Sequence, residues 1–300
     1  MKIAVVVPTC RGFKIPETDM AVKWVVVHDR ELHPVTGKRV DIVAPDPTLY
    51  GQGCDSIRSA GFLYALHNRY DYILTVDDDC EIPFNWVSSH LNGLDSTVHP
   101  WSRTVPELAT RGTPYLAQRK RVAITHGLWS GVPDIDGKTQ KHLPELRLTN
   151  LPNQWDSIHP PFTQSAMNLG FINEVGLVMY QPNQGEGTPF DRFADIWNGL
   201  IAQKCLSLHD YAFLNGGAVV HHTRQSNVDV NIVKEAPGME CHESFWQYVW
   251  DFNGKGTELV NTYAKLAYHI GDFTPPKTEW TSYFQQLKEN MFRWIDETIV

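Results

Sequence analysis

YILTVDDDC, Tyr72 to Cys80, is the stretch that decides the fold of this chain. Its apolar half, Tyr72 to Val76, predicts a buried β-strand, and three carboxylates follow it with no turn residue in between: Asp77, Asp78 and Asp79. Open α/β sheets bind their ligands at the carboxyl ends of the strands. We therefore expect this strand to deliver acids to the ligand-binding edge of an α/β sheet.

The three adjacent carboxylates call for a counter-charge, because burying them unpaired costs several kcal/mol. Alternate side chains of an extended chain share a face, so Asp77 and Asp79 are expected to point one way and Asp78 the other. Such a D-x-D pair could hold Mg²⁺ or Mn²⁺ and leave coordination positions for phosphate oxygens. The structural alternative is a solvated acidic turn, or an Asp that caps the next helix.

The composition is that of a globular protein without a broad basic surface. The chain has 300 residues, with 42% hydrophobic residues, which is enough for one large domain or two modest ones. Its formal net charge of −8 argues against binding duplex nucleic acid over a wide face. Five scattered cysteines predict reduced thiols in the cytoplasm. No apolar run approaches the ~20 residues of a membrane span, and the chain starts with a strand rather than a signal peptide.

Two strands expected before the acidic stretch end in residues suited to a nucleotide. The run Lys2 to Val7 leads into three candidate binding residues, Pro8, Thr9 and Arg11. An arginine in this loop could pair with phosphate, although a plain surface turn is equally consistent with the turn residues. The run Trp24 to Val27 closes on His28 and Asp29, and an acid there could accept hydrogen bonds from a ribose or a uracil N–H.

A helix from about Ile57 to His67 is expected next, because its apolar residues recur at helical spacing. Asp55 or Ser56 is a plausible N-cap, and capping is the favoured role of Asp55. Arg58, in the first turn, could hold a phosphate or an aspartate of the acidic stretch. Strands, helix, strand and acids follow one another in an order typical of α/β nucleotide-binding proteins.

Several blocks along the chain, in the same order, resemble those of one family. They are VVVPTCR, VVHD, the helix start at Asp55-Ser56, TVDDDC, ITHGLWSGVPDIDGKTQ (Ile124 to Gln140), MNLGF (Met167 to Phe171), FDRFADIWNG (Phe190 to Gly199) and HHTRQSNVDVNIVKE (His221 to Glu235). The chain thereby resembles the reversibly glycosylated polypeptides, the plant UDP-arabinopyranose mutase family and its microbial relatives. Roughly Lys2 to Glu235 is covered.

The resemblance implies an α/β fold of GT-A type, a mixed, mostly parallel sheet flanked by helices. Residues 1–240 would form the nucleotide-sugar-binding catalytic domain, and residues 241–300 a helical C-terminal extension packed on it. Within the extension, helices are expected over His242 to Phe252, Thr257 to Ile270 and Thr278 to Ile295. The apolar stripe of the last helix is typical of core or of a subunit contact, so a homo-oligomer is possible.

The middle blocks supply further candidates for sugar binding. His126 would end an apolar strand, and Trp129 would be a packing residue or a sugar platform; a single His in such a run is more often structural than a ligand. Asn168 belongs to the MNLGF block, which the resemblance assigns to the binding site. Asp191 and Asp195 would share one face if their segment is helical, and could act as a general base or bind sugar hydroxyls. Acids that favour a helix start are the alternative, and Asp195 ranks above Asp191.

The block after Gly216-Gly217 predicts a strand that delivers His221 and His222. By resemblance, His222 corresponds to the late metal ligand that many GT-A folds add to the D-x-D pair, so the implied metal set is Asp77, Asp79 and His222. Because Mn²⁺ accepts imidazole more readily than Mg²⁺ does, Mn²⁺ is the favoured cofactor. Asn227 could contact a diphosphate or ribose, or form a simple turn.

One departure from the family bears on its activity. The family's mutases need an arginine upstream of the His-Gly-Leu-Trp block, which becomes reversibly glycosylated. Here TPYLAQRKRVAITHGLW (Thr113 to Trp129) is about one residue shorter, and spacing from Pro114 favours Arg119 over Arg121. If neither arginine lies where the family's glycosylated arginine does, mutase activity is in doubt. Transfer of the sugar to an external acceptor then becomes the better-supported function.

The predicted function is metal-dependent chemistry on a UDP-sugar, with interconversion of UDP-arabinopyranose and UDP-arabinofuranose favoured. A metal would offset charge on the leaving diphosphate. The first alternative is a glycosyltransferase that moves the sugar to a glycan, a protein or a modified nucleobase, because one fold supports both outcomes. The second is a non-catalytic subunit that binds a sugar nucleotide.

Overall fold

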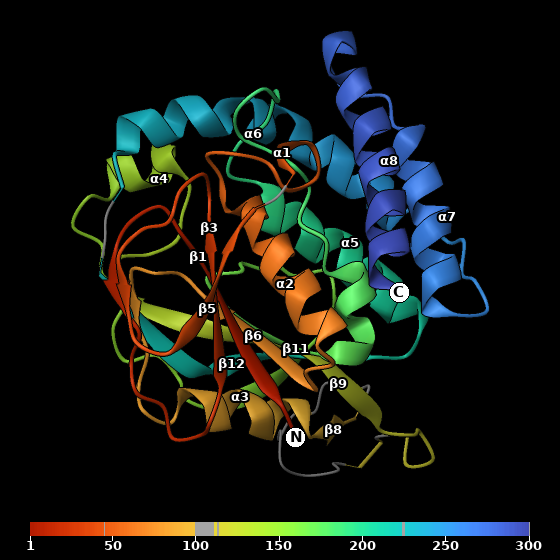
Figure 1. Cartoon of the computed structure of the whole chain (residues 1–300). Coiled ribbons are helices and arrows are strands. Elements are labelled where there is room, and N and C mark those ends of the chain that lie inside the picture. The colour runs from red at the N-terminus through yellow and green to blue at the C-terminus, as the bar shows by residue number, and fades with distance from the viewer. Residues whose placement is uncertain (45, 100–110, 113, 224–225, 300) are drawn as a thin grey trace.

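A ten-stranded sheet forms the centre of the computed structural model, which describes the chain except residues 45, 100–110, 113, 224–225 and 300. Thr113 and part of the HHTRQSN block therefore lie outside the described residues. The main path of the sheet is β10-β12-β9-β11-β6-β1-β3-β5, while β7 pairs with β12 and β8 with β9 (Figure 1). The strands are β1 (Ile3–Thr9), β3 (Lys23–His28), β5 (Arg39–Val43), β6 (Tyr72–Val76), β7 (Cys80–Glu81), β8 (Thr97–Val98), β9 (Lys120–Gly131), β10 (Trp155–Ile158), β11 (Asn168–Ile172) and β12 (Ala212–His222); β2 (Phe13–Lys14) and β4 (Val35–Thr36) form a separate two-stranded sheet.

Strand direction brings the carboxyl ends of β1, β6 and β12 to one edge of the sheet. β6, β1, β3 and β5 run parallel to one another. β11 is antiparallel to both of its neighbours, β6 and β9, and β12 is parallel to β9. β9 and β12 therefore point the same way as β6. The prediction of a mixed, mostly parallel sheet is confirmed, and the shared edge is where Thr9, Asp77 and His222 lie.

Helices cover both faces of the sheet, as expected for strands that are apolar on both sides. α2 (Arg58–His67) packs on β1, where a side chain at Gly61 would collide with Val6 and Val27. α3 (Trp86–Leu94) packs on the opposite face, against β9 and β12. The expected helix from Ile57 to His67 is confirmed to within one residue at its start. The predicted capping role of Asp55 or Ser56 was wrong, because both lie inside a 3₁₀ turn, Asp55–Ile57, that leads into α2, and neither side chain caps the helix.

The remaining helices close the sheet at its sides and carry the C-terminus. They are α1 (Pro47–Tyr50), α4 (Gly137–His142), α5 (Ala194–Leu208), α6 (Val228–Trp250), α7 (Leu259–Gly271) and α8 (Thr281–Thr298), with 3₁₀ turns at Asn173–Val178 and Thr278–Trp280. Within the described residues, none of the helices is long and apolar enough to cross a bilayer.

The first helix of the tail begins at Val228, not at His242 as expected, so the predicted start was wrong. The reason is that α6 runs through Pro237, a residue that usually ends or kinks a helix, and is capped upstream by Asn227. The expected domain boundary at 240/241 consequently falls within α6. The last two helices correspond closely to the predicted ranges.

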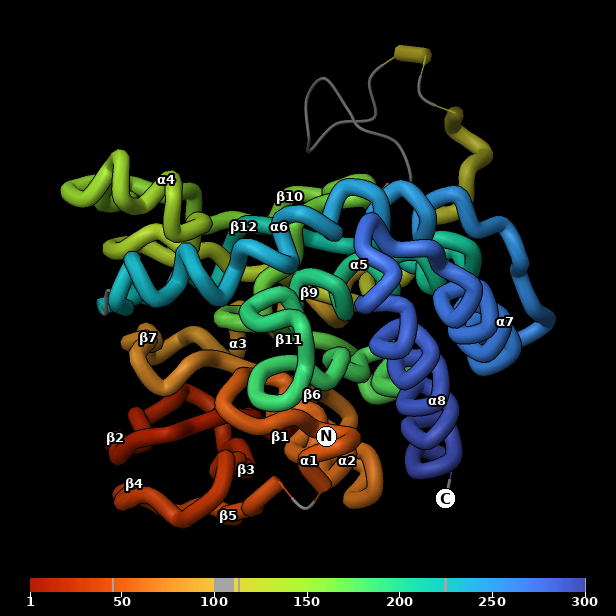
Figure 2. The backbone as a smooth tube through the Cα atoms, turned by 90° about the horizontal axis from the view of Figure 1, so that it is seen from above, coloured from red at the N-terminus to blue at the C-terminus, as the bar shows by residue number. Residues whose placement is uncertain are grey.

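α7 and α8 lie side by side along the flank of the sheet domain (Figure 2). The stripe of α8 is buried: Trp294 is fully enclosed and donates a hydrogen bond from Nε1 to the carbonyl of Leu177 at 2.9 Å. Arg293 pairs with Asp46 at 2.5 Å, and Asn290 donates to the carbonyl of Thr48. The stripe thus serves as core between the tail and the first half of the chain.

Candidate active site

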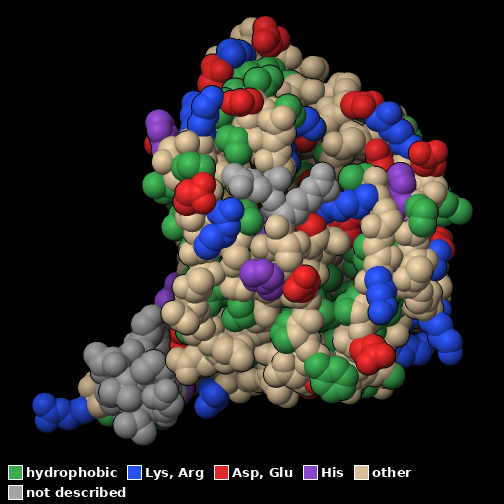
Figure 3. Space-filling model, turned by 90° about the vertical axis from the view of Figure 1, so that its left-hand side faces the viewer, with side chains coloured by type: hydrophobic (Ala, Val, Ile, Leu, Met, Phe, Trp, Pro, Cys, Tyr) green, Lys and Arg blue, Asp and Glu red, His purple; other side chains and the backbone are tan. Residues whose placement is uncertain are grey.

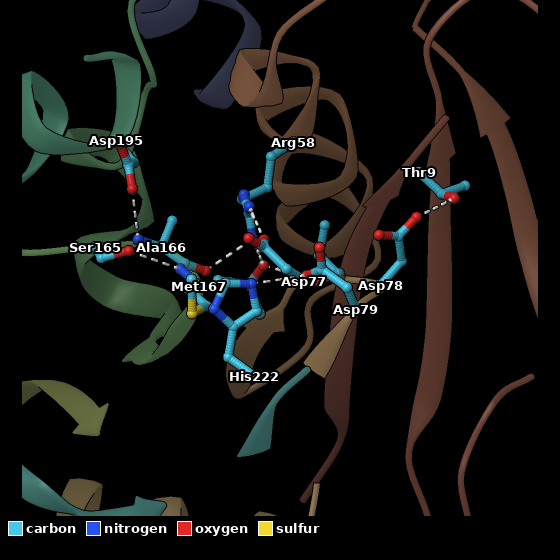
Figure 4. A network of polar contacts seen from close by, with 12 residues as sticks. Thr9, Arg58, Asp77, Asp78, Asp79, Ser165, Ala166, Met167, Asp195 and His222 are labelled. Atoms are coloured by element: carbon cyan, nitrogen blue, oxygen red, sulfur yellow. Dashed lines mark hydrogen bonds and ion pairs between the residues drawn. The ribbon is translucent and has the colours of Figure 1, made fainter. Parts of the chain in front are cut away.

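Asp77, Asp78 and Asp79 form a turn at the carboxyl end of β6, and the expectation of an extended chain was wrong. The amide of Cys80 donates to the carbonyl of Asp77 at 3.1 Å, which closes the turn. The three side chains therefore do not alternate between two faces: Asp77 meets Arg58, while Asp78 and Asp79 both pair with Arg11 and Asp79 also faces His222. Figure 4 shows Arg58 beside Asp77 and His222 beside Asp79. What the sequence did predict is that positive groups gather at these acids.

Asp77 pairs with Arg58, whose side chain is only 1% exposed. The guanidinium donates to Asp77 at 2.5 Å, to the hydroxyl of Thr75 at 2.5 Å and to the carbonyl of Ala166 at 2.8 Å. Its Nε is buried without a hydrogen-bond partner among the described residues. Arg58 therefore ties the acidic turn to the segment before β11, the second of the two roles that the sequence allowed.

Asp78 and Asp79 share Arg11, which comes from the loop after β1. Asp78 accepts a hydrogen bond from the hydroxyl of Thr9 at 2.6 Å and forms an ion pair with Arg11. Asp79 lies 2.8 Å from the same guanidinium and 3.8 Å from Nε2 of His222. Burial would raise the pKa of Asp79, but the hydrogen bond with His222 and the charge of Arg11 outweigh it, and the pKa is lowered. Asp79 is thus held as a carboxylate.

The donor atoms at Asp79 and His222 have the chemistry that Mn²⁺ prefers. Nδ1 of His222 donates to the carbonyl of Val132 at 2.9 Å, and Nε2 faces Asp79. Such an anchored second nitrogen is typical of metal-ligating histidines. Burial would lower the pKa of His222, but the hydrogen bond with Asp79 outweighs it and the pKa is raised. Within the described residues, however, no three His, Cys, Asp or Glu side chains are gathered closely enough to hold a metal together. The metal set of Asp77, Asp79 and His222 stays a prediction.

A second group of carboxylates lies beyond Arg58. Asp195, in the first turn of α5, accepts hydrogen bonds from the amides of Ala166 and Ile196, each at 2.9 Å. Asp134 lies in the loop after β9 and is exposed. The 165–166 segment thus holds Asp195 through the amide of Ala166.

These carboxylates are crowded enough to change their protonation. Burial of the carboxyl group raises the pKa of Asp195 to about 6, and the negative charge of Asp134 raises it further. The same burial, with the charge of Asp195, raises the pKa of Asp55 to about 7. Asp55 and Asp195 are half-buried and Asp134 is exposed, so solvent reaches these carboxylates.

The segment before α5 places Asp191 and Arg192 differently from Asp195. α5 begins at Ala194, so Asp191 is not helical and does not share a helical face with Asp195; it pairs with Lys234 at 2.8 Å. Arg192 has a φ of 66°, in the left-handed region that non-glycine residues seldom adopt. Its guanidinium lies 3.3 Å from Glu235, and its charge, after that of Arg58, partly offsets the rise in the pKa of Asp55. Arg192 and Arg58 are thus cations beside these carboxylates.

His126 and Asn168 are buried, and both serve the protein itself. Nδ1 of His126 donates to Asn215 at 2.8 Å, while Nε2 accepts from the amide of Ser165 at 3.1 Å. The amide group of Asn168 bonds to the carbonyls of Leu128 and Ala218 and accepts from the indole of Trp86. These contacts use the polar atoms of both side chains, as the structural alternative for His126 anticipated.

The other predicted binding residues take up varied positions. Asp29 accepts from the amide of Gly53 at 3.1 Å, and Pro8 lies in β1 next to Val27. Trp129 packs edge-on against His126 with its indole nitrogen buried and without a partner among the described residues. Asn227 accepts from the amides of Asp229 and Val230 as the N-cap of α6, which is its turn role.

Arg119 and Arg121 lie at the opposite end of β9 from the acidic turn. Arg119 donates to the carbonyl of Thr97 at 3.0 Å, and Arg121 pairs with exposed Glu174. At about 3.3 Å per residue, the ten residues from Arg121 to Gly131, beside His222, span roughly 33 Å. The structure therefore brings neither arginine to the site.

A pocket of about 170 Å³ lies behind the acidic turn, on the face of β1 that carries Val7. Its lining includes Asp77 and Asp78 together with aromatic and aliphatic side chains, among them Phe13, Trp24 and Ile82. Figure 3 shows the side of the molecule onto which this edge of the sheet opens; Lys or Arg, Asp or Glu, and His side chains gather around its middle. The edge is thus both charged and recessed.

Sequence reasoning missed Asp134. The pattern Pro133-Asp134 follows the longest strand of the sheet, and an acid at a strand end was the signal used for Asp77, so the same rule could have found it.

The mixed sheet, its flanking helices and its acidic edge define an α/β protein of GT-A-like fold. A model of the family described as "Reversibly glycosylated polypeptide" matches residues 35–298, and the chain belongs to that family. It is 30% identical over 263 residues to probable UDP-arabinopyranose mutase 4 of Arabidopsis thaliana, covering 81% of this chain and 70% of the relative. Probable UDP-arabinopyranose mutase 1 of Pisum sativum is 30% identical over 254 residues, with 76% and 68% covered. UDP-arabinopyranose mutase 2 of Arabidopsis thaliana is 27% identical over 249 residues, again with 76% and 68% covered.

Proposed function

We propose that this protein interconverts UDP-arabinopyranose and UDP-arabinofuranose. The observation that carries the proposal is the family membership, with relatives named UDP-arabinopyranose mutase aligned over about three quarters of the chain. The edge of the sheet supports it, because Arg11 and the acidic turn lie where α/β sheets bind nucleotides. The diphosphate of the substrate would lie at this edge. Its sugar would point towards the carboxylate of Asp195.

Breaking the bond between the sugar and UDP places negative charge on the diphosphate. Arg11 is the exposed cation of the turn, with 31% of its side chain accessible, and can turn towards that charge. Arg58, in contrast, is buried, and its two terminal nitrogens hold Asp77 and the 165–166 segment in place. When bound at Asp79 and His222, Mn²⁺ would supply further charge stabilisation for the leaving group.

The direct test is to incubate the purified protein with Mn²⁺ and UDP-arabinopyranose and to separate the nucleotide-sugars by chromatography. Formation of UDP-arabinofuranose until both forms are at equilibrium is the expected result. Release of free UDP and arabinose, or unchanged substrate, would contradict the proposal. Intact-protein mass recorded in the same samples shows whether a pentose is attached to the chain.

The metal is tested separately with the same assay. Treatment with EDTA should abolish interconversion, and Mn²⁺ should restore it better than Mg²⁺, because His222 offers an imidazole ligand. His222→Ala should remove the preference for Mn²⁺. An EDTA-treated enzyme with full activity would show that the acidic turn works without a metal.

The position of Arg119 and Arg121 favours one second candidate, a glycosyltransferase. Both arginines lie far from the acidic turn, so a mutase that needs one of them as its sugar carrier is not supported by their placement. A transferase would use the same edge for UDP and would pass the sugar to an external hydroxyl. Wild-type protein that forms no furanose but transfers arabinose to an added acceptor would support the transferase. If furanose does form, Arg119→Ala tests the carrier role: unchanged interconversion would show that Arg119 is not needed, whereas its loss would assign Arg119 a role despite its distance.

A further inference from the structure

We propose that His126 is a positioning residue of this site: by accepting the amide hydrogen of Ser165, it fixes the segment 165–167, which holds Asp195 in place relative to the acidic turn. The inference rests on the proposed mutase function and gives that site a residue that acts through other groups. Neither the family match nor the names of the relatives assigns a role to His126.

The segment 165–167 joins the two halves of the site through its backbone. The amide of Ala166 donates to Asp195 at 2.9 Å, and the carbonyl of the same residue accepts from Arg58 at 2.8 Å. Arg58 in turn donates to Asp77 at 2.5 Å, and the amide of Asp77 donates to the carbonyl of Met167 at 3.3 Å. Figure 4 shows Ala166 and Met167 between Asp195 and Asp77. A displacement of the segment would therefore change the distance between Asp195 and the acidic turn.

His126 anchors the start of this segment. It lies in β9 and is 3% exposed, and its Nε2 accepts from the amide of Ser165 at 3.1 Å. Because Nε2 accepts this hydrogen bond, the ring proton lies on Nδ1, which donates to Oδ1 of Asn215 on β12 at 2.8 Å. The hydroxyl of Ser165 also accepts from the amide of Met167 at 3.2 Å. Two strands of the sheet thus fix the ring, and the ring fixes the segment.

The surroundings of the anchor contain donors that are left for a ligand. The ring centroids of Trp129 and Phe162 lie 5.6 and 5.8 Å from that of His126. The indole N–H of Trp129 is buried without a partner among the described residues, and so is Nε of Arg58. Both groups belong to side chains that contact His126 or the segment. An unpaired buried donor is costly, and the hydroxyl or phosphate oxygens of a nucleotide-sugar would supply the missing acceptors.

The proposed reaction needs the two halves of the site at a fixed separation. The diphosphate would lie at the acidic turn and the sugar towards Asp195, so the bond that breaks lies between them. A misplacement of about 1 Å can lower a rate by about 10²-fold, even when the substitution lies away from the reacting atoms. A shift of the segment should therefore slow the chemical step more than it weakens the binding of UDP.

The experiment compares two substitutions of His126. In His126→Leu the side chain keeps a similar volume but offers no acceptor, so the amide of Ser165 loses its partner. In His126→Gln a side-chain carbonyl oxygen can replace Nε2 as the acceptor. For the wild type and both variants, kcat of furanose formation, KM for UDP-arabinopyranose and Kd for UDP alone are measured, and the thermal midpoint reports on folding.

We expect His126→Leu to lower kcat by about 10²-fold while Kd for UDP stays near that of the wild type, and His126→Gln to restore most of kcat. When His126→Leu is combined with Asp195→Asn, the two losses should not add, because His126 acts through Asp195. The matched control is His209→Leu. His209 bonds to Thr262 at 2.6 Å at the opposite end of α5 from Asp195, so the control should lose stability and keep its kcat.

A second variant keeps the test decisive if His126→Leu does not fold. Asn215 is half-buried, and Asn215→Ala removes the acceptor that keeps the ring proton on Nδ1. With the proton on Nε2 instead, the ring cannot accept from Ser165, so kcat should fall in the same direction. A normal kcat in this folded variant would overturn the inference.

The outcomes distinguish this inference from the function on which it rests. A wild-type protein that forms no furanose overturns the proposed function and this inference with it. Wild-type activity with a normal kcat in folded His126→Leu overturns the positioning role alone. Equal losses in His126→Leu and His126→Gln, a parallel loss of UDP binding, or losses that add to that of Asp195→Asn would also overturn it, because His126 would then act on folding or binding.

Discussion

At the scale of single residues, Arg58 decides whether the acidic edge can form. Its side chain touches Asp77, β6 and the segment before β11 from a fully buried position. A buried cation is tolerated here because its two terminal nitrogens meet a carboxylate, a hydroxyl and a carbonyl oxygen. Its positive charge offsets the repulsion among the neighbouring acids, and its hydrogen bonds link α2 to β6 and to the segment before β11.

Replacing Arg58 by Met should therefore destabilise the protein by about 3 kcal/mol, because a buried pair loses one partner; the estimate is at the low end since the Asp77 side chain is 30% exposed. The free energy of unfolding in urea measures this. Arg121→Met is the matched control: the pair with Glu174 is exposed on both sides and should contribute under about 1 kcal/mol. Equal losses for the two variants would refute the central role of Arg58.

Asp55 should make stability depend on pH. Burial, with the charge of Asp195, raises its pKa to about 7 in the folded protein, whereas an unfolded Asp titrates near about 3.9. The folded state therefore binds more protons between about pH 4 and 7, and the stability from this group is lost as pH rises through that window. In Asp55→Asn, the free energy of unfolding should decrease less as the pH rises from about 4 to 7. Urea unfolding between pH 4.5 and 8, with EDTA present, would show parallel curves if the prediction is wrong.

At the scale of elements, the contact between α6 and the start of α5 positions Arg192 and Asp195. Pro237 removes one backbone donor from α6, and Gly238, next to it, lets the ring of Phe193 press against the helix backbone. A Cβ at Gly238 would lie 2.3 Å from the ring. Phe193 directly follows Arg192 and is the N-cap of α5, which begins at Ala194. This contact therefore fixes the position of the first turn of α5, which carries Asp195.

Gly238→Ala should cost roughly 1–3 kcal/mol of stability through overpacking, although Ala favours helices more than Gly does. It should also lower kcat/KM for UDP-arabinopyranose, because Phe193 cannot move without shifting Arg192. Met239→Ala, at the adjacent and partly exposed position, is the control and should change both quantities little. A Gly238→Ala protein more stable than the wild type would show that the ring has room to move.

The elements also show how far sequence reasoning extends. Strand β6 and its acids were predicted because an apolar run followed by charge is a local signal, and α2 because its apolar residues repeat at helical spacing. The start of α6 was not, since Pro237 is locally unfavourable in a helix and only packing against α4 and α5 offsets it. The turn at residues 77–79 was likewise set by Arg58 and Arg11, partners distant in sequence.

At the scale of the whole molecule, the C-terminal helices are part of the same cooperative structure as the sheet. Trp294 of α8 packs near Tyr180 and bonds to the carbonyl of Leu177, while Arg293 reaches Asp46 before α1. A tail bound in this way should unfold together with the rest of the chain. The sequence predicted helices there, but not which part of the protein they would cover.

Trp294→Ala should lower the stability of the entire protein by about 3–5 kcal/mol and leave one transition, because it opens a cavity between tail and core. Unfolding followed by both circular dichroism and tryptophan fluorescence tests this. Ile299→Ala, at a position 64% exposed near the end of the chain, should have little effect. Two separate transitions in the wild type would instead show that the tail unfolds as an independent unit.

The two outer strands of the sheet have a consequence for the behaviour of the protein in concentrated solution. β5 presents Arg39 and Asp41 beside one another, with Asp41 also bound to His28, and β10 has only four residues before Pro160 and Pro161 interrupt the backbone donors. Charges, short strands and prolines at an edge prevent further chains from adding on by backbone pairing. We therefore expect this wide sheet to resist polymerising into fibrils when the protein is concentrated.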